Sequence, residues 1–155
     1  MTSCLSFTVI GIPQPQGSSR AFVPRGWNRA IITTANAKLK PWRQEIAGTA
    51  QVAMIESKLS LLEDVPLSIK ALFFFEKPRS AKKSLRHKIT KPDADKLLRG
   101  LLDSLTGIVF RDDAQITTCY VRKEFGLPSR VEVSIAVEDI DSQFALAADL
   151  QAISS

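Results

Sequence analysis

Alternating apolar and polar positions predict a β-strand over residues 65–75. Its odd-numbered positions are all apolar, whereas Ser68 and Lys70 on the opposite side are polar, as expected for a strand with one face in the core. Leu72 and Phe74 make the second face apolar further along, so we expect a helix or a second subunit to cover them. The main apolar positions on the first side are Leu67, Ile69, Ala71, Phe73 and Phe75.

Four further segments are rich in β-branched and aromatic residues, which is typical of strands. They span residues 6–12, 30–34, 115–125 and 130–137. Gly126 and Pro128 between the last two predict a turn over residues 126–129. We therefore expect the last two strands to form a hairpin.

Apolar residues at helical spacing predict two main helices. Pro41 suits the first turn of a helix that runs to about Lys58. Asp95 is a suitable N-cap for a second helix that begins at Lys96, and Gly107 suits the left-handed position after its end. The expected core stripes are Trp42, Ile46, Ala50, Ala53 and Met54 in the first helix, and Leu97, Leu98, Leu101, Leu102 and Leu105 in the second.

These elements predict an α+β fold, in which a small mixed β-sheet of about five strands packs with two main helices. A length of 155 residues with 45% hydrophobic content suits one domain with a real core. We place this domain at residues 1–137. Residues 138–155 form an acidic tail of the same unit, and the apolar residues between positions 139 and 150 predict an amphipathic helix there.

Charge is distributed unevenly along the chain. The net charge is +5, but all 21 Lys and Arg residues precede Val137 and four acids follow it. The body thus carries 21 basic against 12 acidic residues, a net charge of +9, which favours a polyanionic partner. No apolar run approaches the roughly 20 residues that span a bilayer, and the N-terminus lacks a signal-peptide pattern. We expect a cytoplasmic protein that does not enter a membrane.

The two cysteines do not indicate a metal site. Cys4 and Cys119 lie far apart, without the spacing of zinc ligands, and both have apolar, strand-like surroundings. We expect both to be free thiols buried in the core.

Residues 77–91 form the most basic segment and contain no acid. A charge run of this kind is usually a solvated loop. Here it leads directly into an acidic cluster, and that adjacency favours binding of nucleic acid through phosphate contacts. The residues expected to contact DNA are Lys77, Arg79, Lys82, Lys83, Arg86, Lys88 and Lys91.

The acids that follow are candidates to hold a metal ion. Asp93 and Asp95 are two residues apart on chain expected to be extended, so both carboxylates should point to the same side. Of Asp112 and Asp113, only one should enter a common site, because adjacent strand residues face opposite ways. Converging oxygens suit Mg²⁺, which can support phosphodiester cleavage. Arg99, one turn into the helix, is placed to stabilise charge on the phosphate.

The same residues also have a purely structural interpretation. Asp95 then only caps a helix, and Arg99 and Asp103 form an i, i+4 ion pair on its surface. Asp112 and Asp113 then initiate a turn. The residues alone leave both interpretations open.

The segment PDADKLLRGLLDSLTG at residues 92–107, followed by DDAQI at residues 112–116, resembles the RusA family of Holliday junction resolvases, which are endodeoxyribonucleases. The family pattern is roughly D-x-D-N-L-x-K-x-x-x-D-x-L, then a short spacer and D-D-x-Q. The resemblance covers most of residues 6–137. It implies a magnesium-dependent homodimer, in which Mn²⁺ can substitute, that resolves four-way DNA junctions by paired symmetric nicks.

By position, the resemblance assigns catalytic and metal-binding roles to Asp93, Asp95 and Asp113, and so selects one residue of the second acidic pair. Arg99 falls where the family has a catalytic lysine. It keeps the positive charge but cannot give up a proton. The supporting residues are Asp103, Asp112 and Lys96, the last of which falls where the family has asparagine.

A homodimer also has a physical rationale. A four-way junction has two-fold symmetry, and two equivalent sites related by the same symmetry can nick opposite strands. The face with Leu72 and Phe74, or the acidic tail, is a candidate for the contact. The alternative function is a nucleic-acid-binding protein that keeps the fold without catalysis, which the arginine at position 99 favours.

Overall fold

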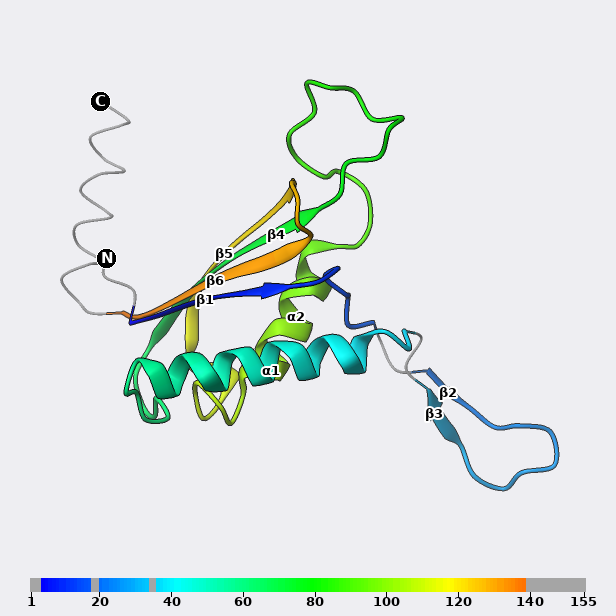
Figure 1. Ribbon diagram of the computed structural model, residues 1–155. Helices are drawn as coiled ribbons and strands as arrows, with labels where there is room; N and C mark the ends of the chain where they lie inside the picture. Colours follow the sequence, from blue (N-terminus) through cyan, green and yellow to red (C-terminus); the bar gives the residue numbers. More distant parts are fainter. Residues whose placement is uncertain (1–3, 18–19, 34–35, 139–155) are drawn as a thin grey trace, which may run out of the picture.

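Two helices pack against one face of a four-stranded β-sheet (Figure 1). The computed structural model describes residues 4–17, 20–33 and 36–138. It confirms the predicted α+β class with a mixed sheet and two main helices. The helix expected between residues 139 and 150 lies outside the described residues. Neither of the two described helices has the length and apolar character needed to cross a membrane.

The sheet is mixed because its most apolar strand pairs in both directions. It contains β1 (Leu5–Ile10), β4 (Leu67–Phe75), β5 (Ile116–Phe125) and β6 (Arg130–Val137) in the order β1-β6-β4-β5. β4 runs parallel to β5 and antiparallel to β6, and β6 runs antiparallel to β1. β5 and β1 are therefore the two edges.

The predicted hairpin of the last two strands is wrong, because β4 lies between β5 and β6. β4 has a buried face and a half-buried opposite face, so it takes a central place where both of its edges are paired. The connection after β5 passes tightly over the end of β4. The Gly126 amide donates to the Phe75 carbonyl, and a Cβ on Gly126 would lie 2.9 Å from the Phe74 ring.

The two faces of the sheet differ in what covers them. The side chains of Ile69, Ala71 and Phe73 are buried under the helices, as the alternation predicted. Leu72 and Phe74 face the other way and are half-buried. Both described helices lie on the first face, so the expected helical cover of the second face is absent from the described residues. There the Arg130 guanidinium lies 3.9 Å from the centre of the Phe74 ring.

Helix α1 spans Leu39–Glu56 and helix α2 spans Ala94–Leu105. Both predicted core stripes are confirmed in outline. Trp42, Ile46, Ala50 and Met54 of α1 are buried, and so are Leu97, Leu101 and Leu105 of α2. Ala53, Leu98 and Leu102 pack at the margin of the same core.

A short two-stranded ribbon stands apart from the sheet (Figure 1). It consists of β2 (Arg20–Phe22) and β3 (Ile31–Thr33), which pair antiparallel. Only β3 was predicted from the sequence. The described residues thus form four strands in the sheet and two in the ribbon, in place of a single sheet of about five.

The cysteines are free, as predicted, but they are not both buried. Cys4 is half-buried, and its thiol donates to the Ile135 carbonyl. Cys119 is exposed because it lies on β5, an edge strand of the sheet.

Candidate active site

The first acidic pair lies at the N-terminus of α2. Asp93 is the N-cap, with extended backbone angles, and Asp95 lies in the first helical turn. The predicted N-cap at Asp95 is therefore wrong, because the helix begins directly after the extended residue that follows Pro92. Consecutive helical residues are rotated by about 100°, so the two carboxylates do not point to one side as an extended chain would place them.

Asp93 is held in its charged form by its neighbours. Its carboxylate lies 3.0 Å from the Lys96 ammonium. The hydrogen bond and charge of Lys96 lower the pKa of Asp93, and the charges of Lys91 and Lys123 act in the same direction. An ionised carboxylate is the oxygen ligand that Mg²⁺ requires, so this part of the site fits the ion that the sequence predicted.

The Lys96 ammonium has two effects on Asp93: it keeps the carboxylate ionised, and it occupies the carboxylate in place of a metal ion. Changing Lys96 to Met should raise the pKa of Asp93, so the carboxylate becomes protonated at a higher pH as the solution is acidified. As the pH rises from acid, metal binding should then begin at a higher pH, because the carboxylate must first lose its proton. At neutral pH the affinity for the metal ion should increase, because the Lys96 ammonium no longer competes with it. A Mn²⁺ titration across the acidic range, followed by electron paramagnetic resonance, measures both effects. An unchanged pH midpoint, with Lys40→Met as control, would show that Lys96 does not govern the site.

Asp93 lines an open cavity of about 550 Å³. Three lysines line it, and its other wall comes from the proline-rich chain after β1 and from Asn36, three residues before α1. These two segments are joined by Asn36, whose side-chain amide donates to Gln14 Oε1 at 3.1 Å and to the Pro15 carbonyl at 3.3 Å. The lining residues are Ile12, Pro13, Gln14, Pro15, Gly17, Asn36, Phe75, Lys88, Lys91, Pro92, Asp93 and Lys96. A carboxylate among several ammonium groups can receive a phosphate and a metal ion together.

The sequence did not reveal the contribution of Gln14 and Asn36 to this cavity. The sequence around each of these residues predicts only a loop. The two loops come together at the cavity because α1 packs beside β1. The proline-rich composition of residues 13–17 was the one available signal, and it predicts a turn rather than a binding wall.

The basic segment before α2 is tied to β5. The Lys88 amide donates to the Lys123 carbonyl, and the Phe125 amide donates to the Arg86 carbonyl. Glu124 is buried and lies 3.0 Å from Arg122 and 3.7 Å from Arg86. The end of the predicted DNA-binding loop is therefore fixed to the edge of the sheet, beside the cavity.

Of the predicted DNA-binding residues, Lys88 and Lys91 line this cavity, and Lys88 is the more buried of the two. Its ammonium lies 5.3 Å from the centre of the Phe75 ring and donates to the Thr90 hydroxyl. Partial burial and the nearby charge of Lys123 lower the pKa of Lys88. Lys77 is also half-buried and donates to the Lys83 carbonyl. The exposed basic residues of this segment are Arg79, Lys82, Lys83, Arg86 and Lys91.

Lys123 holds the chain that presents Asp93. Its ammonium donates to the Thr90 carbonyl at 2.9 Å and to the Pro92 carbonyl at 2.8 Å. Changing Lys123 to Met removes both charge-assisted hydrogen bonds and should lower the free energy of unfolding by about 1–3 kcal/mol. Cleavage should fall more than DNA binding, because Asp93 loses its fixed position. Urea denaturation measures the first effect, and Lys70→Met on the open face of the sheet, expected to change stability by less than about 0.5 kcal/mol, is the control.

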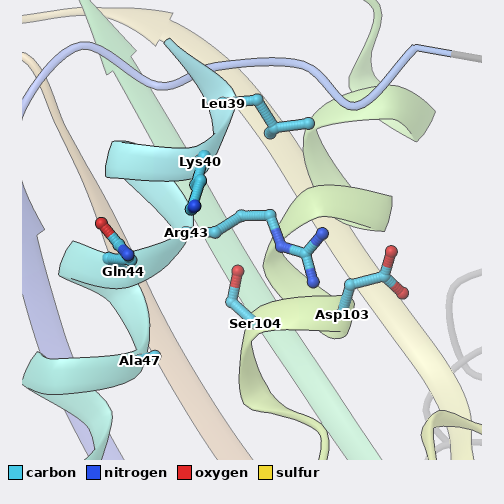
Figure 2. Close-up of a pocket in the computed structure, with 7 residues that line it drawn as sticks. All are labelled: Leu39, Lys40, Arg43, Gln44, Ala47, Asp103 and Ser104. Carbon is cyan, nitrogen blue, oxygen red and sulfur yellow. The ribbon is translucent and has the colours of Figure 1, made fainter. Parts of the chain in front are cut away.

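Further along α2, Arg99 is exposed and Asp103 is half-buried. Among the ion pairs of the described residues, none joins these two side chains, so the structural alternative of a surface pair is wrong. Asp103 instead accepts a hydrogen bond from Gln16 Nε2. Figure 2 shows Arg43 reaching from α1 toward Ser104 and Asp103, in a separate cavity of about 460 Å³ between the helices.

The second acidic pair has two distinct environments. Asp112 caps the short 3-10 helix η1 (Asp113–Gln115), since its carboxylate accepts from the Ala114 amide and its own amide donates to the Gln115 side chain. Gln115 also donates to the Leu62 and Val65 carbonyls. Asp112 is thus engaged in a structural motif, and Asp113 presents an exposed carboxylate.

A single chain does not bring Asp113 to the first acidic pair. Asp93 precedes the 12 residues of α2, which are about 18 Å long, and Asp113 follows the loop at its other end. The positions along β5 also show this separation. Lys123 contacts Pro92, next to Asp93, whereas η1 with Asp113 leads into Ile116 at the start of the strand. Lys123 and Ile116 are about 23 Å apart along β5. Within the described ranges, no group of three or more acidic, His or Cys side chains is arranged to hold a metal ion.

Comparison with known proteins agrees with the motif. Residues 13–136 match the family described as Endodeoxyribonuclease RusA. The chain therefore belongs to this family of Holliday junction endodeoxyribonucleases. It is also similar to Uncharacterized protein YqaN of Bacillus subtilis (strain 168), with 30% identity over 142 residues that cover 85% of this chain and 95% of YqaN.

Proposed function

We propose that two copies of this chain form a magnesium-dependent endonuclease that resolves four-way DNA junctions by paired symmetric nicks. The observation that carries the proposal is the ionised Asp93 carboxylate in a lysine-lined cavity, in a chain of the RusA family. Mn²⁺ should replace Mg²⁺, because both accept carboxylate and water oxygens. As an enzyme acting on DNA, the protein is proposed to work in the cytoplasm.

The separation of the acids favours a site shared between two chains. We infer that Asp93 and Asp95 of one copy meet Asp113 of the second, since α2 keeps them at opposite ends within each copy. In an isologous dimer this exchange occurs twice, so it yields two equivalent sites. Two-fold symmetry of the protein then matches the symmetry of the junction and accounts for paired nicks.

Each proposed site residue has a defined task in cleavage. When bound, Mg²⁺ lowers the pKa of a coordinated water and offsets the charge on the phosphate. Asp93, Asp95 and Asp113 would hold the ion. Lys88, Lys91 and Lys96 would bind the phosphate, and Arg99 would grip it with two donors without transferring a proton.

The supporting residues act through the geometry of these groups. Asp112 fixes the turn that presents Asp113, and Asp103 ties the chain at Gln16 to α2 through its hydrogen bond. Exposed basic residues of the segment 77–91 would bind the DNA arms beside the cavity.

The test compares synthetic four-way, flap and linear duplex DNA, each incubated with the protein with and without Mg²⁺. Symmetric nicking of the four-way junction alone, only with the metal ion, is the expected result. Binding of the junction without nicking in Mg²⁺ or Mn²⁺ would contradict the proposal.

That contradictory result would favour the second candidate function, a junction-binding protein without catalysis. Two observations favour this candidate: the Lys96 ammonium occupies one side of the Asp93 carboxylate, and arginine stands at position 99. Both departures weaken metal chemistry while leaving the positive charge that DNA binding requires.

A further inference from the structure

The β2–β3 ribbon and its loop form an arm, residues 20–33, that projects from the body of the protein (Figure 1). The arm exposes an unusual amount of apolar surface for its size. The exposed fractions are 50% for Phe22, 59% for Val23, 60% for Trp27 and 70% for Ile32. Apolar side chains gathered on so small an element indicate a binding surface.

A tight turn fixes the aromatic group in this arm. The Trp27 amide donates to the Pro24 carbonyl at 3.0 Å, and Gly26 has a φ of +88°. This combination is typical of a type II turn, which requires glycine at its third position. The turn places Arg25 at the corner and Trp27 directly after it. A hollow lined by Gly26, Trp27, Asn28 and Arg29 lies beside the indole.

The charge of the arm selects the kind of partner. Residues 20–33 contain Arg20, Arg25 and Arg29 and no acid. Positive charge attracts phosphates, and an exposed indole is a platform on which an unpaired base can stack. Arg25 and Arg29 flank Trp27 in the sequence. A second copy of this basic arm would be repelled by the same charges, so the arm is not suited to pair with itself.

The described residues nearest in sequence to both ends of the arm lie at the candidate active site. Gly17 and Asn36 line the cavity around Asp93, and in the sequence they lie three residues before and three residues after the arm. DNA bound at Asp93 therefore passes the base of the arm, and the arm can reach a neighbouring part of the same molecule.

We propose that the arm recognises the open centre of branched DNA, with Trp27 stacked on an unpaired or unstacked base and Arg25 and Arg29 on the flanking phosphates. The inference rests on the proposed function and deepens it, because it makes the arm the element that distinguishes a branch point from a plain duplex. A base at a branch point is partly unstacked already, so stacking on Trp27 costs less there than in a linear duplex.

Tryptophan fluorescence tests this directly. The chain has two tryptophans, and Trp42 is only 5% exposed, so quenching by added DNA reports Trp27. Without metal ion, a four-way junction should quench the emission strongly and a linear duplex of the same length weakly. Trp27→Leu should abolish the quenching and weaken junction binding by roughly tenfold, whereas Trp27→Phe should keep most of the affinity. Ile55→Ala, an exposed apolar position on α1, is the matched control.

The outcomes separate this inference from the proposed function. Tight junction binding with unchanged emission and with normal affinity in Trp27→Leu would overturn the role of the arm and leave the nuclease proposal intact. Equal quenching by junction and duplex would overturn branch recognition. Sedimentation of the free protein gives the last comparison: if Trp27→Leu dissociates a dimer, the arm is an interface between copies and the inference is wrong.

Discussion

Changing Asp93 to Asn is expected to abolish cleavage of a four-way junction and to leave junction binding intact. The substitution keeps the size of the side chain and removes the charge that we propose holds the metal ion. Removing a residue that supports a metal ligand through a hydrogen bond typically lowers metal affinity or activity by about 10- to 100-fold. Loss of a ligand itself should therefore reduce the cleavage rate by at least about 100-fold. Asp113→Asn should have the same effect. Single-turnover cleavage and gel-shift titrations on the same DNA measure the two quantities.

The matched control is Glu45→Gln, which makes the same chemical change at an exposed position on α1. It should cleave at the wild-type rate. Normal cleavage by both aspartate variants would refute the assignment of Asp93 and Asp113. Loss of binding along with cleavage would instead assign these carboxylates to the structure of the DNA-binding surface.

Neutralising Lys82, Lys83, Arg86 and Lys88 together should cause the second large effect. Each phosphate contact contributes about 0.9 to the slope of log affinity against log salt, so the slope should fall by up to about 3.6 per chain. The environments of the four residues rank them. Lys82 and Lys83 are exposed, Arg86 also pairs with Glu124, and Lys88 is half-buried with a lowered pKa. Lys82 and Lys83 should therefore account for most of the change.

The control for this experiment removes two charges from α1, at Lys40 and Arg43, which line the separate cavity between the helices. Filter binding at several salt concentrations gives the slopes. An unchanged slope in the fourfold variant would show that the basic segment does not contact DNA.

Local patterns in the sequence predicted the elements but not how they pair. The leucines of α2 and the alternation of β4 fix their buried faces, because helical and strand periods are local properties. The order of the strands depends on contacts between distant residues, so the turn at Gly126 predicted a hairpin that the central position of β4 prevents. β2 has three residues and is too short for its alternation to be recognised.

The candidate site shows the same division. Sequence located the acids and the basic segment that precedes them. One local signal for the role of Asp112 was present, since Asp112 and Gln115 have the spacing of a capping box. The ion pair of Asp93 with Lys96 has the i, i+3 spacing of neighbours on a helix and was open to prediction once the helix start was placed at Ala94. The separation of Asp93 from Asp113 follows from the straight course of α2 between them, which the expected meeting of the acids in one chain did not take into account.

The central claim is that one copy supplies Asp93 and Asp95 and the other supplies Asp113. Mixed dimers test it, made by co-expressing an Asp93→Asn chain and an Asp113→Asn chain with different affinity tags. If the site is shared, one site of each mixed dimer contains both substitutions and the other contains neither, so nicking of the junction on one strand should return. If each chain carries its own complete site, both sites are damaged, and a mixed dimer as inactive as its parents would contradict the account.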